Sequence, residues 1–404
     1  MRVAWDRTPS PGTSALGLFI DVGSRDEWEA VFGASHFLEH AVFKGAGARG
    51  GREIAEAGDA LGAEINAFTT RDYTCFYGKS MDPMLSAVYD LVQSMVHEPW
   101  LASADIDRER QVILEEMRQS YDDTGDRVAE AFMRAMYEDA IFTHDVLGNE
   151  TSIQNLTVEQ LRDFHRRFYV PRRMALALAG EGGRQVIEQL EAADTVGRVP
   201  QRRVPKPRPS EVVIEEDREQ VQVLLGVPAP FFGSDDAYVC DLLATLLGGQ
   251  TSSRLWQRLR EEEGLVYSVD VDYEAEPDWG VMTVGLAVHP SRLEQALHLV
   301  GEELNRAIRQ GFSETEIARA KIQQRAGLWF GFETVDHRML HLGRHLLRNQ
   351  LPLALPDVEA RIEEVGASEL AAMTKALWED PNRVALAVVG AVGGVAEQGL
   401  KHLL

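Results

Sequence analysis

The pattern of apolar and polar positions along the chain predicts helices alternating with short strands. Apolar residues recur every three or four positions in residues 84–96, which predicts an amphipathic helix, whereas the nearly unbroken apolar run at 15–22 predicts a buried strand. Residues 62–77 are rich in β-branched and aromatic side chains around a polar Thr-Arg-Asp turn, and this combination predicts a β-hairpin. Both kinds of element occur in both halves, so we predict the α+β class, with helices packed on mostly antiparallel sheets.

A repeated segment indicates that the chain is a duplication. Residues 171–180 read Pro-Arg-Arg-Met-Ala-Leu-Ala-Leu-Ala-Gly and residues 381–390 read Pro-Asn-Arg-Val-Ala-Leu-Ala-Val-Val-Gly, each time after a helix-like amphipathic segment. Residues 198–209 between them are rich in proline and arginine, which predicts a stiff, extended linker. The 404 residues also exceed the roughly 250 to 300 at which single cores stop growing. The chain is therefore expected to have a first half (1–195), a linker (196–210) and a second half (211–404).

The strongest chemical signal lies in residues 34–40. His36, Glu39 and His40 form the pattern His-x-x-Glu-His on a segment that reads as a short helix. Residues four apart on a helix are surface neighbours, so the two imidazoles can reach one metal ion. Glu39 lies beside them, where it can activate a water molecule. This order inverts the His-Glu-x-x-His pattern of zincins and indicates a zinc hydrolase.

A catalytic zinc site usually has a third protein ligand, which must come from elsewhere in the chain. Residues 107–117 read as a helix on which Glu109 and Glu116 lie two turns apart on one face. We predict Glu116 as the third ligand and Glu109 as a group that orients a ligand histidine or tunes the metal's charge. Glu115 remains an alternative ligand, because adjacent helical residues point about 100° apart and the sequence does not define the helix phase.

These residues resemble the family of pitrilysin, insulin-degrading enzyme and mitochondrial processing peptidase. In that family a glutamate ligand follows at a similar distance, in a helix like Glu-Arg-x-x-Ile-Leu-x-Glu, and here seventy-five residues separate His40 from Glu116. The resemblance implies a processing-peptidase-like metallohydrolase fold and one zinc ion per chain on His36, His40 and Glu116. It also implies that Glu39 is the general base and that Glu109 supports the site.

The resemblance further implies a strand that binds substrate. Asn66, Ala67 and Phe68 stand where the family has an exposed sheet edge beside the metal, to which an extended peptide adds as one more strand. Without the neighbouring metal motif, the same residues read as an ordinary strand with Phe68 in the core.

A further feature of the family is an arginine and a tyrosine seven residues apart, which contact the substrate main chain and the oxyanion. Arg260 and Tyr267 have this spacing. Arg260 lies in a predicted helix that ends at Gly264, and Tyr267 lies in the strand that follows. Read alone, Arg260 is a surface charge and Tyr267 a half-buried strand residue.

The second half is expected to lack a metal site and to serve substrate binding. Residues 238–249 correspond in position to the His-x-x-Glu-His helix, yet they are apolar and contain no histidine. At the start of the chain the family's usual opening strand pattern is not evident, so we expect an edge strand of the first sheet to be missing or altered.

Composition narrows the class of partner. A net charge of −23 argues against nucleic acid, since phosphate binding requires clustered Lys and Arg. The acidity would suit basic peptides, but it is more often a matter of solubility. Cys75 and Cys240 offer no Cys-x-x-Cys pattern and are expected to be buried thiols. No signal peptide or membrane-length apolar run is evident, so we expect a cytoplasmic protein without a membrane partner.

The combined prediction is a zinc metalloendopeptidase that hydrolyses peptides or unfolded, presequence-like segments inside a closed chamber. Family chains of this length pair into a clamshell, so we expect a homodimer in which Arg260 and Tyr267 act in trans on the partner's zinc site. The alternative is a non-catalytic or partner-dependent subunit of a processing-peptidase-like complex. A hydrolase of small molecules is a third possibility, disfavoured by the peptide-binding strand and the duplication.

Overall fold

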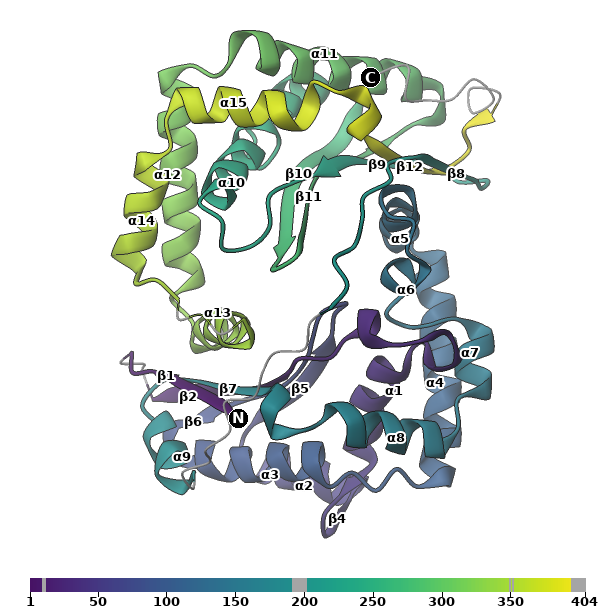
Figure 1. Cartoon of the computed structure of the whole chain (residues 1–404), viewed down its shortest axis with the longest axis vertical. Coiled ribbons are helices and arrows are strands. Elements are labelled where there is room, and N and C mark those ends of the chain that lie inside the picture. The colour runs from purple at the N-terminus through teal and green to yellow at the C-terminus, as the bar shows by residue number, and fades with distance from the viewer. Residues whose placement is uncertain (9–11, 191–201, 349, 351, 394–404) are drawn as a thin grey trace. The chain divides into compact units, whose positions relative to one another are not determined.

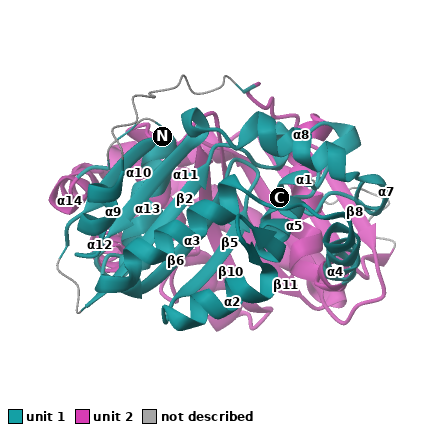
Figure 2. Cartoon of the chain, turned by 90° about the horizontal axis from the view of Figure 1, so that it is seen from below, with its two compact units in different colours: residues 1–118, 144–202, 329–353 teal, residues 119–143, 203–328, 354–404 magenta. Residues whose placement is uncertain are grey.

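The computed structural model describes residues 1–8, 12–190, 202–348, 350 and 352–393. These residues form two compact units, and each unit takes one segment from the opposite half of the sequence (Figure 2). Unit 1 contains residues 1–118, 144–202 and 329–353, and unit 2 contains residues 119–143, 203–328 and 354–404. Of the predicted linker, residues 196–201 lie outside the described residues, and Arg202 belongs to unit 1.

Unit 1 is built on a five-stranded sheet in the order β1-β7-β2-β6-β5 (Figure 1). β1 pairs with β7 in parallel, and the other neighbours are antiparallel. The predicted hairpin is confirmed as β5 and β6. Of the expectation that an edge strand is missing or altered, the first alternative is wrong, because β1 forms one edge of this sheet, with Val3 opposite Leu176. The strands are β1 (Arg2–Asp6), β2 (Thr13–Ile20), β5 (Glu64–Thr69), β6 (Thr74–Met81) and β7 (Met174–Ala179).

The two faces of this sheet bury side chains of different size. On one face Leu16, Leu18 and Ile20 of β2 pack with helices α1 (Ala34–Ala41), α3 (Leu85–His97) and α8 (Val158–Phe168). On the other face small residues let helix α13 (Val335–Leu347) approach closely (Figure 1). A Cβ atom on Gly17 would lie 2.2 Å from Met339 Sδ, so this approach requires glycine. The remaining α-helices of unit 1 are α2 (Gly51–Ala60), α4 (Ser103–Asp122), α7 (Glu150–Asn155) and α9 (Gly183–Gln189).

Unit 2 repeats this topology with a sheet in the order β10-β11-β9-β12-β8. The repeated segments of the sequence form β7 and β12, and each lies second from an edge, parallel to the edge strand and antiparallel to its inner neighbour. This equivalence confirms the predicted α+β fold of two similar halves. The strands are β8 (Glu211–Glu215), β9 (Val221–Pro228), β10 (Val266–Glu276), β11 (Trp279–Val288) and β12 (Ala385–Gly390).

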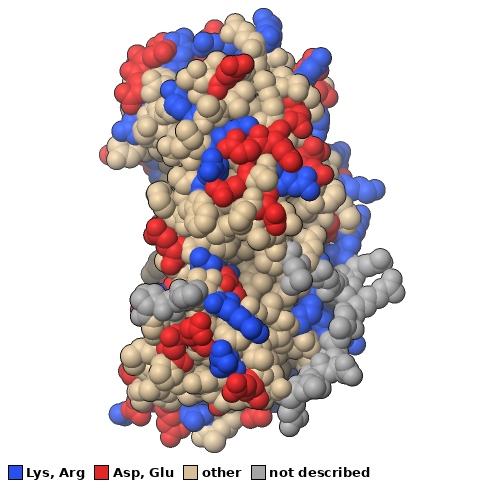
Figure 3. Space-filling model, turned by 90° about the vertical axis from the view of Figure 1, so that its left-hand side faces the viewer, with Lys and Arg blue, Asp and Glu red and all other residues tan. Residues whose placement is uncertain are grey.

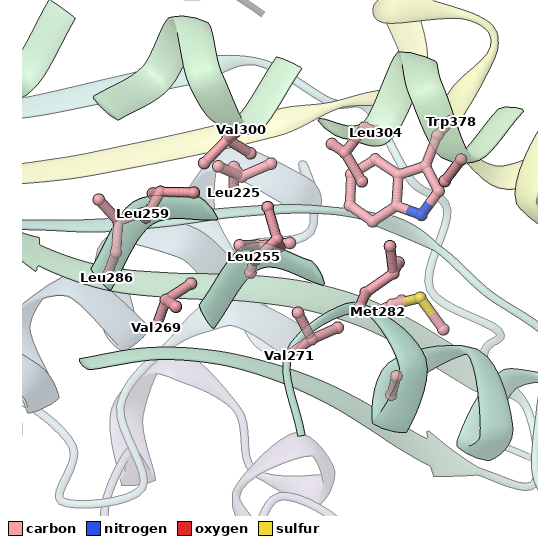
Figure 4. Close-up of a cluster of buried hydrophobic side chains, with 14 of the residues drawn as sticks. Leu225, Leu255, Leu259, Val269, Val271, Met282, Leu286, Val300, Leu304 and Trp378 are labelled. Carbon is pink, nitrogen blue, oxygen red and sulfur yellow. The ribbon is translucent and has the colours of Figure 1, made fainter. Parts of the chain in front are cut away.

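Helices again cover both faces of the second sheet. One face buries an aliphatic cluster that includes Leu255, Leu259 and Val269, together with α10 (Asp236–Leu247), α11 (Leu293–Gln310) and α15 (Ala367–Trp378) (Figure 4). The other face packs against α5 (Thr124–Met136). A short π-helix, η6 (Trp256–Glu262), precedes β10. The remaining helices are α6 (Ala140–Thr143), α12 (Glu314–Gly331) and α14 (Leu355–Glu364).

Further predictions concern cysteines, surface charge and membrane association. Cys75 and Cys240 are free and buried, as predicted. On the face drawn in Figure 3, acidic and basic side chains are interspersed in small groups rather than gathered by sign. Within the described parts of the chain, every helix is too short or too polar to cross a lipid bilayer.

Candidate metal centre

The structure brings His36, His40 and Glu116 together in unit 1. One potential ligand atom from each lies within 4.8 Å of the others. The Nε2 atoms of His36 and His40 lie 3.7 and 3.6 Å from the two carboxylate oxygens of Glu116. In a tetrahedral zinc site with metal–ligand distances near 2.0–2.1 Å, ligand atoms lie roughly 3.3 to 3.4 Å apart. The two histidine–glutamate distances are a few tenths of an ångström longer than in such a site, and the three side chains are placed to hold one zinc ion.

The phase of α4 distinguishes the two candidate glutamates. Glu115 is exposed and pairs with Arg118 at 2.5 Å, one turn along the helix surface. Glu116, the next residue, faces both histidines of α1. Of the two glutamates left open by the sequence, only Glu116 lies where it could share a metal ion with His36 and His40.

Glu109 lies behind His40, on the same face of α4 as Glu116. Its Oε2 atom is 3.4 Å from His40 Nδ1, and its Oε1 atom forms an ion pair with Lys44 Nζ at 2.8 Å. A carboxylate on Nδ1 directs the other ring nitrogen of a histidine toward a metal. His36 differs, because its Nδ1 atom is buried without a hydrogen-bond partner among the described residues. Glu109 is thus placed to orient one of the two histidines.

Glu39 is held in place by a residue that the sequence analysis did not single out. Thr69, the last residue of β5, donates a hydrogen bond from Oγ1 to Glu39 Oε2 at 2.5 Å. Burial raises the pKa of Glu39, and the hydrogen bond from Thr69 partly opposes this shift. Thr69 directly follows the predicted substrate strand 66–68, and that position was the available signal for its role.

The protonation of the cluster suits metal binding. Burial, assisted by the neighbouring His40, lowers the pKa of His36 to about 3, so its imidazole is neutral at pH 7 and has a free lone pair. Burial also raises the pKa of Glu116, while the nearby His40 lowers it. Two imidazole nitrogens and a carboxylate form the donor set of several catalytic zinc sites.

Helix α1 has only eight residues, and a buried pair fixes its start. Glu27, with a fully buried side chain, accepts hydrogen bonds from the backbone N–H groups of Gly33 at 2.6 Å and Ser35 at 2.8 Å. His144 Nε2 lies 2.9 Å from the same carboxylate, and its ring stacks on Phe32 with a centroid distance of 3.8 Å. Sequence analysis missed both Glu27 and His144, since neither belongs to a motif.

The proposed substrate strand is an edge of the first sheet. Among the described residues β5 pairs only with β6. Asn66 is exposed, and Ala67 packs on the face that carries α1. Phe68 points to the opposite face, where its ring contacts Tyr73 and Tyr77 at centroid distances of 5.8 and 6.1 Å. The three residues share the strand, but their side chains lie on different faces of the sheet.

In unit 2 the structure brings Arg260 and Tyr267 into contact. The guanidinium carbon of Arg260 lies 5.1 Å from the centroid of the Tyr267 ring. Tyr267 lies in strand β10, as expected, but it is 77% exposed, so the expectation that it is half-buried is wrong. Among the described residues, no group of three potential metal ligands lies in unit 2, where α10 contacts β10 as α1 contacts β5.

Two units of one topology, with a His-x-x-Glu-His helix facing a downstream glutamate in the first, are the features of an inverted-zincin metallopeptidase. Comparison with known proteins agrees. Residues 2–149 match the family model described as insulinase (peptidase family M16), and residues 155–324 match the model described as the peptidase M16 inactive domain. The chain belongs to peptidase family M16.

Relatives resemble the chain over nearly its full length. It is 34% identical to an uncharacterized zinc protease of Mycobacterium tuberculosis, over 97% of this chain and 92% of that protein. It is 27% identical to an uncharacterized zinc protease of Bacillus subtilis, over 96% and 95%. A protease structure from Helicobacter pylori superimposes with a TM-score of 0.85 at 20% identity, covering 96% of each chain, and shares the fold.

Proposed function

We propose that the chain is a zinc metalloendopeptidase that hydrolyses peptides and unfolded or presequence-like segments, with one zinc ion per chain on His36, His40 and Glu116. The approach of these three side chains within 4.8 Å of one another carries the proposal. When bound, the zinc would polarise the scissile carbonyl and lower the pKa of a water molecule. The zinc protease names of the relatives support the same class of reaction.

In this proposal Glu39 is the general base. The hydrogen bond from Thr69 occupies Oε2, which leaves Oε1 to take a proton from the attacking water and to pass it to the leaving amine. Burial, which raises the pKa of Glu39, brings the carboxylate closer to the operating pH, where a general base is most effective. Glu109 keeps the ring of His40 in its ligating orientation.

The substrate is proposed to bind as an extended strand on the free edge of β5. Main-chain hydrogen bonds to residues 66–68 would position the peptide, as in other cases of strand addition. The contact between Thr69 and Glu39 supports this arrangement, because it puts the end of the edge strand beside the proposed base.

The active form is proposed to be a homodimer enclosing a chamber, in which Arg260 and Tyr267 act on the zinc site of the partner. In support, one chain carries both the ligand set and the Arg–Tyr pair. A mixture of His40→Ala and Tyr267→Phe chains should regain activity, since one site of the mixed dimer would have all its groups intact. Failure of the mixture to regain activity would refute action in trans.

The test of the proposed function combines metal content with cleavage of a quenched-fluorescent peptide library. One zinc per chain is expected in both the intact chain and Glu39→Gln, with cleavage by the intact chain alone. Zinc without cleavage in either would favour the alternative, a non-catalytic or partner-dependent subunit. The absence of zinc from both would refute the ligand assignment.

A further inference from the structure

The proposed substrate contact Arg260 lies on a helix with an unusual hydrogen-bond register. Residues Trp256–Glu262 form a π-helix, in which hydrogen bonds join residues five apart. Leu255 and Leu259 anchor this segment in the core of unit 2 (Figure 4). The residues that follow them, Trp256 and Arg260, are both partly exposed.

Arg260 contacts two aromatic rings. Its guanidinium carbon lies 4.3 Å from the centroid of the Trp256 ring and 5.1 Å from that of Tyr267. Among the described residues Arg260 forms neither a hydrogen bond nor an ion pair. Aromatic faces attract a guanidinium without using its N–H groups. All five donors therefore remain available for a ligand.

This freedom is unexpected, because three glutamates follow Arg260 directly in the sequence. Glu261 instead accepts a hydrogen bond from Trp256 Nε1 at 3.2 Å, a pair five residues apart as the π-helical register allows. Glu262 and Glu263 both accept from Arg258 Nη1, at 3.1 and 2.9 Å. The segment thus engages each neighbouring carboxylate elsewhere and leaves the arginine unneutralised.

We propose that Trp256 is a positioning residue for Arg260. Its indole ring holds the guanidinium in a fixed orientation with the donors open, and its N–H group keeps Glu261 away from them. The role rests on the proposed function, in which Arg260 contacts the substrate main chain. Trp256 itself touches the aliphatic core on one side and the guanidinium on the other, so its effect on substrate passes through Arg260.

The activity test is a double-mutant cycle on kcat/KM for a quenched-fluorescent peptide. Trp256→Leu, which removes the ring, is expected to lower kcat/KM about 2- to 5-fold, the range of an exposed cation–π contact. Trp256→Phe, which retains a ring but lacks the N–H group that holds Glu261, is expected to recover only part of this loss. In the Arg260→Ala background, Trp256→Leu should cause no further loss. An equal loss in both backgrounds would show a purely structural role and overturn the proposal.

A second measurement does not depend on turnover, so it separates this inference from the proposed function. In zinc-loaded chain labelled with ¹⁵N-arginine, the Arg260 Nε–H signal can be assigned by its disappearance in Arg260→Lys. Ring currents should displace this signal, and Trp256→Leu should shift it toward the position of an exposed arginine. An unchanged signal in Trp256→Leu would overturn the positioning role of Trp256, whereas a shifted signal in a chain that cleaves no peptide would refute only the proposed function.

Discussion

Replacing Glu109 with glutamine tests whether this carboxylate supports the metal centre through His40. Glutamine retains a carbonyl oxygen that can face His40 Nδ1, so the substitution removes mainly the negative charge. Loss of an outer-shell partner typically lowers metal affinity 10- to 100-fold. The distance of 3.4 Å from Glu109 Oε2 to His40 Nδ1 is long for a charged hydrogen bond, which favours the smallest loss of metal affinity in this range. Lys44 also loses its partner, but it is exposed enough to be hydrated instead.

We therefore expect zinc affinity to fall about 10-fold in Glu109→Gln, equivalent to about 1.4 kcal/mol. Competition with a chromophoric zinc chelator at fixed pH measures this change directly. Glu115→Gln is the matched control on the same helix, because Glu115 faces Arg118 and solvent. The zinc affinity of the Glu115→Gln chain should equal that of the intact chain. Equal affinities of Glu109→Gln and the intact chain would refute the reasoning, as would an equal loss in Glu115→Gln.

Three further predictions follow from other contacts. Thr69→Val removes a hydrogen bond that lowers the pKa of Glu39, so the acid limb of the pH profile of kcat/KM should move to higher pH; a limb that stays in place would refute the contact. Glu27→Gln should lower the free energy of unfolding by about 1–3 kcal/mol in urea titrations, because glutamine has one acceptor oxygen where both oxygens of Glu27 accept from backbone N–H groups at the start of α1. Arg254 holds the pKa of Glu316 at about 2, below the usual 4.5, so this pair stabilises the fold above pH 4.5 and loses its effect as pH falls toward 2. Glu316→Gln should thus be less stable by about 1–2 kcal/mol at pH 7, after allowance for solvent screening, and the difference should shrink at low pH.

Local spacing was sufficient to predict that His36 and His40 lie together and that the chain contains a duplication. His36 and His40 lie four apart on a helix, and this relation holds wherever the helix is packed. The repeated strand segments, β7 and β12, indicated the internal symmetry because each is buried on both faces and therefore nearly all apolar. The choice between Glu115 and Glu116 could not be made in this way, since it depends on how α4 is rotated against α1.

Residues that act across the fold left no local pattern. Thr69 and Glu39 are thirty positions apart, and Glu27 and His144 are separated by 117, so their contacts arise only when strand, loop and helix are assembled. The membership of α5 and α13 in opposite units also escaped prediction. An amphipathic helix shows that it packs on an apolar face, but the sequence does not show which of two similar sheets provides that face.

The short length of α1 explains why the zinc motif alone does not define the site. Isolated helices of fewer than about 12–15 residues are marginal in water, and α1 has eight. Its start is instead held by Glu27 and by Gly33, whose φ of 88° and close contact with Leu147 exclude other residues. The orientation of His36 relative to Glu116 thus depends on groups outside the motif. A chain that retained His-x-x-Glu-His but lost Glu27 or Gly33 should bind zinc poorly, although every ligand would be present.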